Sequence, residues 1–314
     1  MCTAIAIGGK ECYFGRNMDW CEDFGLRPCI VPRDFVCDFR FLPRRERQLA
    51  MIGMARVEEG APLFAEAVNE KGLAMAGLNF IGNAFYESET RQGRRNVCAW
   101  ELILWLLGEA GSLPQAKSLI DGLRLIDSPL REDLPNAQLH WILSDKSGSL
   151  VLEARRDGLH VFPDPVGVLT NNPPFEHQLS HLSLFAGLSP YERESRMNEA
   201  IPELAKGFGT GAFGLPGDYS SPSRFVKTAW LVGESELDRI TDEEGRVSHL
   251  FSILASVAPP LGSVRNREGM PHRTLYSLVS NTSRGSVYLR RSDSLNTESY
   301  RLADFAQGDA PVIL

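Results

Sequence analysis

The sequence has no long hydrophobic run, no basic surplus and no export signal. Its longest apolar run, Leu102 to Leu107, is far shorter than the roughly 20 residues that a membrane-spanning helix needs. Acidic residues outnumber basic ones by 40 to 33, and the net charge of −7 argues against nucleic acids and anionic membranes, which bind basic surfaces. Met1 to Trp20 lacks the basic start and sustained apolar stretch of a secretory signal. We therefore expect a cytoplasmic protein with no membrane or nucleic-acid partner.

Global disorder is excluded by the composition. Of 314 residues, 43% are hydrophobic and 23% are charged, which are the proportions of an ordinary globular protein. No internal repeat, low-complexity segment or linker divides the chain. We expect residues 1–314 to form a single domain with a large buried core.

Cysteine is scarce and unevenly distributed. Five of the six cysteines precede residue 38, and the set is Cys2, Cys12, Cys21, Cys29, Cys37 and Cys98. Disulfide frameworks belong to small oxidised domains, and structural zinc sites use pairs of cysteines separated by about two to four residues, a spacing that these five do not show. One reactive thiol among inert ones is the third interpretation, and it is the one that the spacing favours.

Cys2 differs from the other cysteines because it follows the initiator methionine. Removal of Met1, which a small second residue permits, gives a chain that begins with a cysteine. That residue carries a thiol and a free α-amine on one Cα, so the amine can accept the thiol proton and later protonate a leaving group. Many proteins begin with Met-Cys without catalytic meaning, so the pattern indicates an N-terminal nucleophile only together with further residues.

Apolar patterning predicts strands at both ends of the chain and helices between and after them. The predicted strands are two around the turn at Gly8 and Gly9, then 28–36, 48–55, 64–68, a hairpin over 67–79, a hairpin over 139–162 with its turn at 146–149, 166–170, 275–280 and 287–290. The predicted helices are 100–110, 114–126, 175–186, 224–232 and 247–257, with Ser221 and Pro222 as a helix start. Residues 200–208 are predicted to be helix or loop. This order predicts an α+β architecture in which helices sandwich buried sheets.

Two motif matches are interpreted as coincidences. Residues 209–214 match G-x-G-x-x-G, but the following Leu-Pro-Gly prevents a helix from starting there, so we expect a glycine-rich loop. His177 and His181 lie four residues apart on a predicted helix, but no third metal ligand is evident nearby in the sequence. We therefore predict no metal site.

Further polar residues interrupt apolar or glycine-rich stretches and support a site around Cys2. Arg16 and Asp19 fall just after the second predicted strand, where a guanidinium can stabilise a thiolate and a carboxylate can hold an α-amine. Asn79 and Asn171 end strands, where an amide or a backbone N–H can point at a developing oxyanion. Arg224 opens a helix after the glycine-rich loop. Each of these residues alone has an ordinary structural explanation.

Seven segments, in this order and spacing, resemble the choloylglycine hydrolase family, which includes bile salt hydrolases and penicillin V acylases. They are MCTAIAI, FGRNMDW, VNEKGLAMAGLNF, LHWILSD, GVLTNNPPF, GLPGDYSSPSRFVKTAW and FSILASVAP, and the resemblance runs from Met1 to about residue 290. It implies an N-terminal-nucleophile hydrolase fold of four layers, αββα, with two antiparallel sheets between helical layers. It also implies a homotetramer and no cofactor.

The resemblance also implies a role for each residue of the site. The family's positions fall on matching residue types, with Cys2 as nucleophile, Arg16 and Asp19 flanking it, Asn79 and Asn171 associated with the oxyanion hole, and Arg224 as the remaining active-site arginine. Asn79 favours a bile salt hydrolase, since penicillin acylases of the family tend to carry an aromatic residue at this position.

The implied activity is hydrolysis of the amide bond that joins a bile acid to glycine or taurine, through an acyl-thioester on Cys2. A steroid requires an apolar wall, for which we predict residues of neighbouring loops: Met18, Phe24, Ile81, Phe85 and Leu139. Two alternatives stay open. One is a penicillin V or other N-acyl amide acylase that uses the same residues, and the other is a non-catalytic zinc or redox-sensing cysteine protein.

Overall fold

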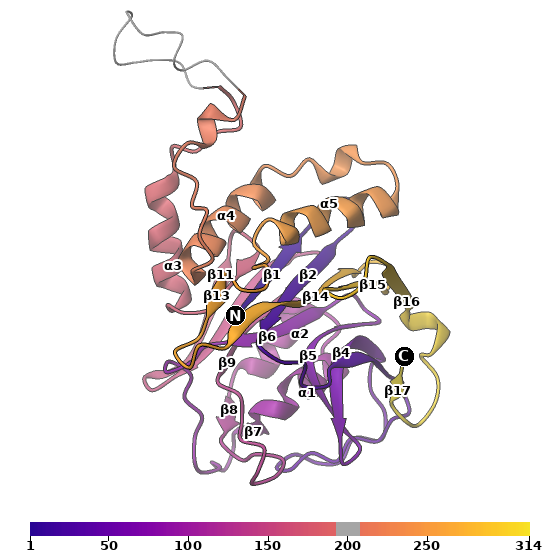
Figure 1. The fold of residues 1–314 in the computed structure, drawn as a ribbon. Coiled ribbons are helices and arrows are strands. Elements are labelled where there is room, and N and C mark those ends of the chain that lie inside the picture. The colour runs from indigo at the N-terminus through magenta and orange to yellow at the C-terminus, as the bar shows by residue number, and fades with distance from the viewer. Residues whose placement is uncertain (193–207) are drawn as a thin grey trace, which may run out of the picture.

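The chain folds into two large antiparallel sheets and a small parallel pair. The computed structural model describes residues 1–192 and 208–314 (Figure 1), so the predicted helix or loop over 200–208 lies almost wholly outside the described residues. The first sheet contains β1 (Cys2–Ile7), β2 (Tyr13–Trp20), β12 (Val168–Leu169), β13 (Val264–Arg265), β14 (Pro271–Asn281), β15 (Ser286–Arg291) and β16 (Thr297–Arg301). The second contains β3 (Arg27–Val31), β4 (Met51–Glu58), β5 (Ala61–Asn69), β6 (Ala74–Asn79), β9 (Leu139–Asp145), β10 (Gly148–Arg155), β11 (Gly158–Asp164) and β17 (Val312–Ile313). The parallel pair is β7 (Arg95–Cys98) with β8 (Leu123–Ile126).

Strand order places the N-terminal strand beside strands from the second half of the chain. The first sheet has the order β12-β1-β2-β14-β15-β16, with β13 paired to β14, and the second has the order β11-β10-β9-β6-β5-β4-β3-β17. The N-terminal strand β1 therefore lies between β2 and the short strand β12, which leads into Asn171. This arrangement brings the start of the chain beside a segment that is almost 170 residues away.

Helices cover the outer face of each sheet. They are α1 (Leu102–Glu109), α2 (Leu113–Ile120), α3 (Phe175–Leu182), α4 (Ser221–Gly233) and α5 (Glu243–Ala255). Helix α4 contacts β1, and α5 contacts β2 and β14, whereas α1 contacts β5 and β6 and α2 contacts β9 and β10. Figure 1 shows α4 and α5 side by side over β1 and β2. The predicted αββα layering is confirmed.

The core has two parts that follow these layers. One cluster fills the space between the sheets and under α4 and α5, with Ile5, Ile52 and Phe225 among its members. The other packs α1 and α2 against the second sheet. Helix α1 is buried at every residue except Glu109, as its apolar character on all sides predicts. Within the described residues, no helix is long and apolar enough to cross a membrane.

Several predicted elements have different bounds; the strand predicted over 28–36, for example, ends at Val31. The helix predicted over 114–126 ends at Ile120, and Gly122 follows with a φ of +83°, so residues 123–126 leave the helix and pair with β7. The hairpin predicted over 139–162 contains a second turn, which divides its second half into β10 and β11. The cap residue of α4 is Ser220, and the Ser221 hydroxyl instead accepts the backbone N–H of Asn171 at 2.8 Å.

Asp164, at the end of β11, makes the free energy of unfolding depend on pH. Burial raises the pKa of its carboxyl to about 6, although the N–H groups of Val166 and Gly167 donate to Oδ1. The folded state thus holds a proton that the unfolded chain releases near pH 4, so stability falls by about 3 kcal/mol as the pH rises from about 4 to about 6. We expect Asp164→Asn to be more stable than the wild type at neutral pH and to lose this advantage near pH 4. Urea denaturation across this range checks the difference, and equal pH dependence of both proteins would contradict it.

Candidate active site

Cys2 lies at the first residue of β1, inside the molecule. Its side chain is 2% exposed, and the pairing of β1 with β2 places Met18 opposite it. The Nη2 atom of Arg16 lies 3.0 Å from Sγ of Cys2. A guanidinium at hydrogen-bond distance stabilises the thiolate, which is the nucleophilic form of cysteine.

Arg16 is fixed by a buried ion pair. Its Nη1 donates to Oε2 of Glu66 at 2.5 Å and to the carbonyl oxygen of Ala65 at 3.0 Å, and the Tyr276 hydroxyl donates to Oε1 of Glu66 at 2.8 Å. The side chains of Arg16 and Glu66 are each 1% exposed. Burial alone would lower the pKa of the Arg16 guanidinium, but the charges of Cys2 and Glu66 raise that pKa above its ordinary value. The positive charge beside Sγ is therefore permanent.

Glu66 is a residue that sequence analysis missed. It interrupts β5, whose neighbouring residues Phe64, Ala65 and Ala67 are apolar, and a carboxylate buried in such a strand needs a partner of opposite charge. That pattern could have drawn attention to Glu66. It could not have identified Arg16 as the partner, since 50 residues separate the two along the chain.

Asn171 joins Cys2 to Asn79. Its Oδ1 accepts the backbone N–H of Cys2 at 2.8 Å, and its Nδ2 donates to the backbone carbonyl of Asn79 at 2.8 Å. The next N–H after Asn79, that of Phe80, donates to the segment leading into β9. Because N–H groups alternate in direction along a strand, the N–H of Asn79 points to the opposite edge of β6, where the pairing with β5 has already ended. The N–H of Asn79 is thus left outside the ladder of the sheet.

Arg224, in the first turn of α4, reaches the same point and is fully buried. Its Nη1 donates to the carbonyl oxygen of Cys2 at 2.5 Å and to Oγ1 of Thr3 at 2.7 Å, while its Nη2 donates to Oδ1 of Asn171 at 2.8 Å. Burial lowers the pKa of this guanidinium, and the charge of Asp19 opposes that effect. Arg224 therefore ties α4 to both Cys2 and Asn171.

Asp19 lies on β2 beside the N-terminus. Its backbone N–H donates to the carbonyl of Met1 at 3.0 Å, and the amino group of Met1 donates to the carbonyl of Asp19 at 2.8 Å. The Thr274 hydroxyl donates to Oδ1 at 2.6 Å, whereas Oδ2 is buried and finds no partner in the described part of the chain. Burial raises the pKa of the Asp19 carboxyl, and the charge of Arg224 acts in the opposite direction. The structure therefore brings all six residues of the predicted site together around the start of β1.

A cavity of about 630 Å³ opens onto this cluster, and its lining includes Cys2, Arg16 and Asn79. Of the predicted wall residues, four line it: Met18, Phe24, Ile81 and Leu139. Sequence analysis missed most of the apolar wall, which also includes Trp20, Trp100, Trp141, Leu130, Leu134 and Ile103. The charged side chains on its described lining are Arg16 and Arg56, and each is paired with a carboxylate, Glu66 and Glu58 respectively. This lining suits a large apolar molecule.

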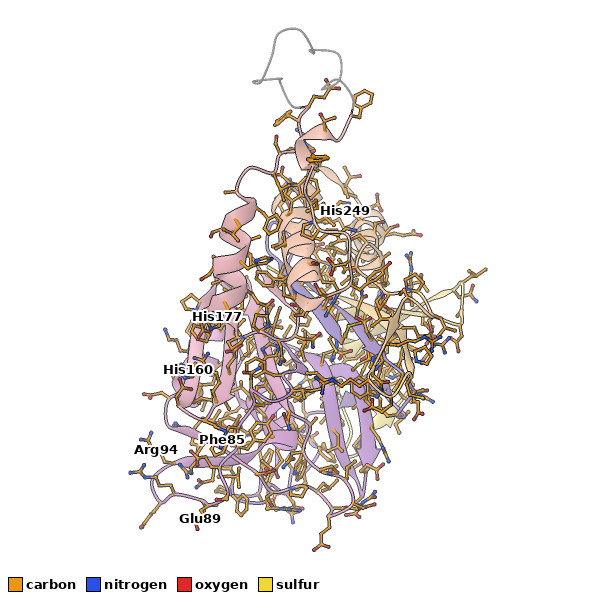
Figure 2. All side chains as sticks on the ribbon, turned by 60° about the vertical axis from the view of Figure 1, so that its left-hand side comes forward. Phe85, Glu89, Arg94, His160, His177 and His249 are labelled. Atoms are coloured by element: carbon orange, nitrogen blue, oxygen red, sulfur yellow. The ribbon has the colours of Figure 1, made fainter. Side chains whose placement is uncertain are left out.

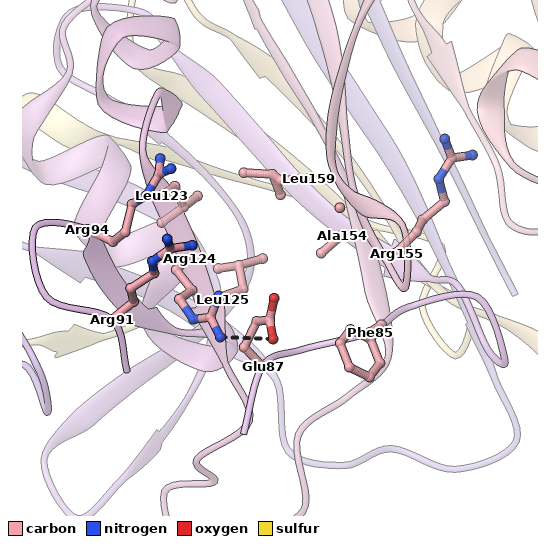
Figure 3. Close-up of a pocket in the computed structure, with 11 residues that line it drawn as sticks. Phe85, Glu87, Arg91, Arg94, Leu123, Arg124, Leu125, Ala154, Arg155 and Leu159 are labelled. Atoms are coloured by element: carbon pink, nitrogen blue, oxygen red, sulfur yellow. Dashed lines mark hydrogen bonds and ion pairs between the residues drawn. The ribbon is translucent and has the colours of Figure 1, made fainter. Parts of the chain in front are cut away.

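Phe85 does not line this cavity, which corrects its prediction as a wall residue. Its backbone N–H donates to the carbonyl of Ala154 at 2.9 Å, so the chain after β6 turns toward β10, and its ring lies 5.1 Å from the Arg156 guanidinium. Figure 3 shows Phe85 at a separate pocket of about 190 Å³, whose basic residues are Arg91, Arg94, Arg124 and Arg155. In Figure 2 it lies near Arg94 and Glu89, at the lower end of the molecule.

The other cysteines show no shared chemistry, and all six are free. Burial raises the pKa of the Cys29 thiol to about 12 and that of the Cys37 thiol to about 11, so both stay protonated near neutral pH.

His177 and His181 lie on α3 as predicted. In residues 1–192 and 208–314, no three His, Cys, Asp or Glu side chains are placed to hold a metal ion. The glycine-rich motif at 209–214 forms a short 3-10 turn rather than a strand-to-helix junction.

Known proteins are similar to this chain in both sequence and fold. A family model described as linear amide C–N hydrolases, choloylglycine hydrolase family, matches residues 2–307. A bile salt hydrolase/transferase of Lactiplantibacillus plantarum is 37% identical over 302 residues, which cover 96% of this chain and 92% of that relative. A conjugated bile acid hydrolase of Lactobacillus gasseri is 32% identical over 307 residues, with coverages of 97% and 96%.

Solved structures agree with this relationship. The C2A mutant of the conjugated bile acid hydrolase from Clostridium perfringens matches with a TM-score of 0.91 and 30% identity, over 100% of this chain and 96% of that one. A penicillin V acylase from Agrobacterium tumefaciens shares the fold, with a TM-score of 0.76 and 17% identity over 98% and 90% of the two chains. The chain has the N-terminal-nucleophile hydrolase fold and belongs to the choloylglycine hydrolase family of hydrolases that act on linear amide C–N bonds.

Proposed function

We propose that this chain hydrolyses the amide bond of conjugated bile salts and releases the free bile acid with glycine or taurine. The observation that carries the proposal is one buried thiol, Cys2, which Arg16 contacts at the edge of a large apolar cavity. The relatives named as bile salt or conjugated bile acid hydrolases support this substrate class. So does the lining of the cavity, whose apolar side chains suit a steroid.

In the proposed reaction, Cys2 acts after Met1 has been removed. Removal converts the backbone N–H of Cys2, which donates to Oδ1 of Asn171 at 2.8 Å, into a free α-amine beside the thiol. The buried Oδ2 of Asp19 supports this step, because it has no partner among the described residues while Met1 is present. An α-ammonium group formed on Cys2 next to Asp19 would give this oxygen a hydrogen-bond partner of opposite charge.

The first half of the reaction forms an acyl-thioester. The Sγ thiolate of Cys2 bonds to the amide carbonyl carbon, and the carbonyl oxygen takes up the negative charge. Nδ2 of Asn171 and the backbone N–H of Asn79 stabilise this oxyanion, and loss of one such donor costs about 2.7 to 4 kcal/mol of transition-state stabilisation. The α-ammonium then protonates the amide nitrogen as the C–N bond breaks and the amine leaves.

The second half releases the bile acid. Water attacks the thioester carbonyl while the α-amine, now neutral, accepts a proton from it. The C–S bond then breaks, the carboxylic acid leaves, and the Cys2 thiolate and α-ammonium are restored. Apart from the substrate and one water molecule, neither half uses a group from outside the chain.

One set of substrates tests the proposal. Purified protein is mixed with glycine conjugates, taurine conjugates and penicillin V, amine release is measured, and the mass of the N-terminus is determined. We expect release of glycine or taurine by a protein that lacks Met1. Faster hydrolysis of penicillin V than of any bile salt conjugate would give the same site a different substrate, and Met1 retained in active enzyme would exclude the α-amine as base. Reaction of several thiols with iodoacetamide, with no amine release, would instead favour the redox-sensing alternative.

We also propose that the protein is a cytoplasmic homotetramer. Four large apolar side chains are exposed on the described segments that flank residues 193–207: Leu184, Tyr191, Phe208 and Phe213. Exposed apolar groups gathered in this way are typical of subunit contacts. Six free cysteines are typical of a reducing compartment. Light scattering should give about four times the 34.8 kDa of one chain, and a monomer at micromolar concentration would refute the tetramer.

A further inference from the structure

His140, on β9, is a fully buried titratable residue that the proposed reaction does not use. Its Nε2 lies 3.0 Å from the carbonyl oxygen of Thr170, and its Nδ1 lies 3.1 Å from Oε1 of Glu153, which is also fully buried. Because a carbonyl oxygen only accepts hydrogen bonds, Nε2 carries a hydrogen and donates it to Thr170. The hydrogen bond between Nδ1 of His140 and Oε1 of Glu153 requires that one of these two atoms carries a hydrogen. His140 therefore connects Glu153 to the residue that precedes Asn171.

The same imidazole also contacts the residue that follows Asn79. The rings of His140 and Phe80 are stacked, with centroids 4.4 Å apart and planes 5° from parallel, and Phe80 is fully buried. His140 thus meets the neighbours of both asparagines, one by a hydrogen bond and the other by stacking. Asn171, which follows Thr170, donates from Nδ2 to the carbonyl of Asn79, which precedes Phe80, at 2.8 Å. The bond between the two asparagines is therefore directly adjacent in sequence to both contacts of His140.

Glu153 anchors this arrangement to a helix. Its Oε1 also accepts the backbone N–H of Phe175, the first residue of α3, at 3.0 Å. A buried pair such as His140 with Glu153 adds little net stability, because removing both groups from water costs about as much as their attraction returns. What the pair does contribute is a fixed geometry between β9, β10 and the start of α3.

We propose that the His140–Glu153 pair is a positioning unit that holds Thr170 and Asn171 against the end of β6. This inference rests on the proposed amide hydrolysis. With the pair in place, Nδ2 of Asn171 and the N–H of Asn79 converge on one oxygen. His140 is absent from the described lining of the large cavity, so it acts through its neighbours rather than on the substrate.

A second set of contacts keeps the Asn171 segment folded when His140 is changed. Nε2 of Gln178 donates to the carbonyl of Asn171 at 2.6 Å, and the Thr170 hydroxyl donates to Oε1 of Gln178 at 2.7 Å. Gln178 lies on α3 and, within the part of the chain that the structure describes, makes no hydrogen bond to β6, so it holds the segment without fixing it relative to Asn79. Loss of His140 should therefore displace the two asparagines relative to each other without unfolding the protein.

The test compares two substitutions at His140 with a matched control. His140→Phe keeps a ring to stack on Phe80 but removes the donor to Thr170, whereas His140→Gln restores an N–H donor. The control is His160→Phe, on β11, where the histidine also stacks on a phenylalanine and contacts a carboxylate, but at the surface shown in Figure 2. We expect His140→Phe to lower kcat by about 10²-fold with KM within about threefold, His140→Gln to recover about tenfold of that loss, and His160→Phe to stay within about twofold of the wild type.

Alkylation of Cys2 by iodoacetamide separates positioning from general damage, because this reaction needs the thiolate but no oxyanion donor. The alkylation rate should be unchanged in His140→Phe. A parallel fall in alkylation and kcat, equal kcat in the two His140 variants, or a fall in kcat of less than about threefold would each overturn the proposal. If His140→Phe does not fold, Phe80→Leu tests the link from the Asn79 side and should lower kcat while KM is kept. If the wild type hydrolyses penicillin V and no bile salt, the proposed function fails, but the same ratios measured on penicillin V still decide the inference.

Discussion

Replacing Cys2 with alanine is expected to abolish amide hydrolysis, with kcat reduced by about a thousandfold or more. Among the described residues that line the large cavity, Cys2 is the sole thiol or hydroxyl nucleophile. Alanine still permits removal of Met1, so the α-amine remains and the loss measures the contribution of the sulfur alone. The fold should persist, because Arg16 keeps its bonds to Glu66 and Ala65. Amine release and thermal unfolding, measured on the same preparation, check both expectations.

Cys21→Ser is the matched control for this substitution. Cys21 directly follows β2 and is half-buried, so a hydroxyl in place of its thiol should leave kcat within about twofold of the wild type. Cys29 and Cys37 are less suitable, because both are buried and their substitution would change stability as well. Hydrolysis by Cys2→Ala at more than about a tenth of the wild-type rate would exclude Cys2 as the nucleophile.

Arg16→Met should affect both catalysis and stability. Methionine removes the charge that lies 3.0 Å from Sγ of Cys2, and we expect kcat/KM to fall by about 10² to 10³-fold. It also leaves Glu66 buried without its partner, which costs about 3 to 5 kcal/mol of unfolding free energy. Burial already raises the pKa of the Glu66 carboxyl, and loss of Arg16 raises it further. The stability deficit should therefore be smaller in mild acid, where Glu66 is protonated, and grow as the pH rises.

A double variant separates the two effects of Arg16. Adding Glu66→Gln to Arg16→Met removes the unpaired carboxylate, so stability should return at neutral pH while kcat/KM stays low. Arg124→Met is the matched control, because Arg124 forms a more exposed pair with Glu87 at 3.0 Å and should change stability by less than about 1 kcal/mol. Urea denaturation and conjugate hydrolysis provide the two readouts. Recovery of activity in the double variant would show that Arg16 acts through the fold rather than on the thiolate.

Most elements could be predicted because their signals lie within a few residues. Helix α1 is apolar on all sides and is buried, and the first two strands follow from their β-branched and aromatic residues on either side of a glycine turn. The end of α2 was missed, although Gly122 is a local stop signal for a helix. Residues 123–126 suit a helix or a strand, and their parallel pairing with β7 decided for the strand.

The candidate site likewise has a part that could be predicted from the sequence and a part that depends on distant partners. Six residues of matching type in matching segments were enough to predict Cys2 and its neighbours. The structure gathers these residues at one point, and their roles stay predictions. Phe85 was misplaced because the direction of the chain after β6 depends on its bond to Ala154, on another strand. Glu66 was missed for the same reason, since its partner Arg16 lies 50 residues away in the sequence.

By itself, the sequence determined that Cys2 combines a thiol with a latent α-amine, and that apolar segments of strand and helix period follow one another in an α+β order. Which charges meet was decided only by the tertiary structure. Arg16 finds Glu66 across the two sheets, Arg224 reaches Cys2 from α4, and the described part of the chain leaves Oδ2 of Asp19 unpartnered at the N-terminus. The physical reason is that burial makes a charge costly unless a partner is present, and that partner is supplied by the packing of distant strands, which no local pattern encodes.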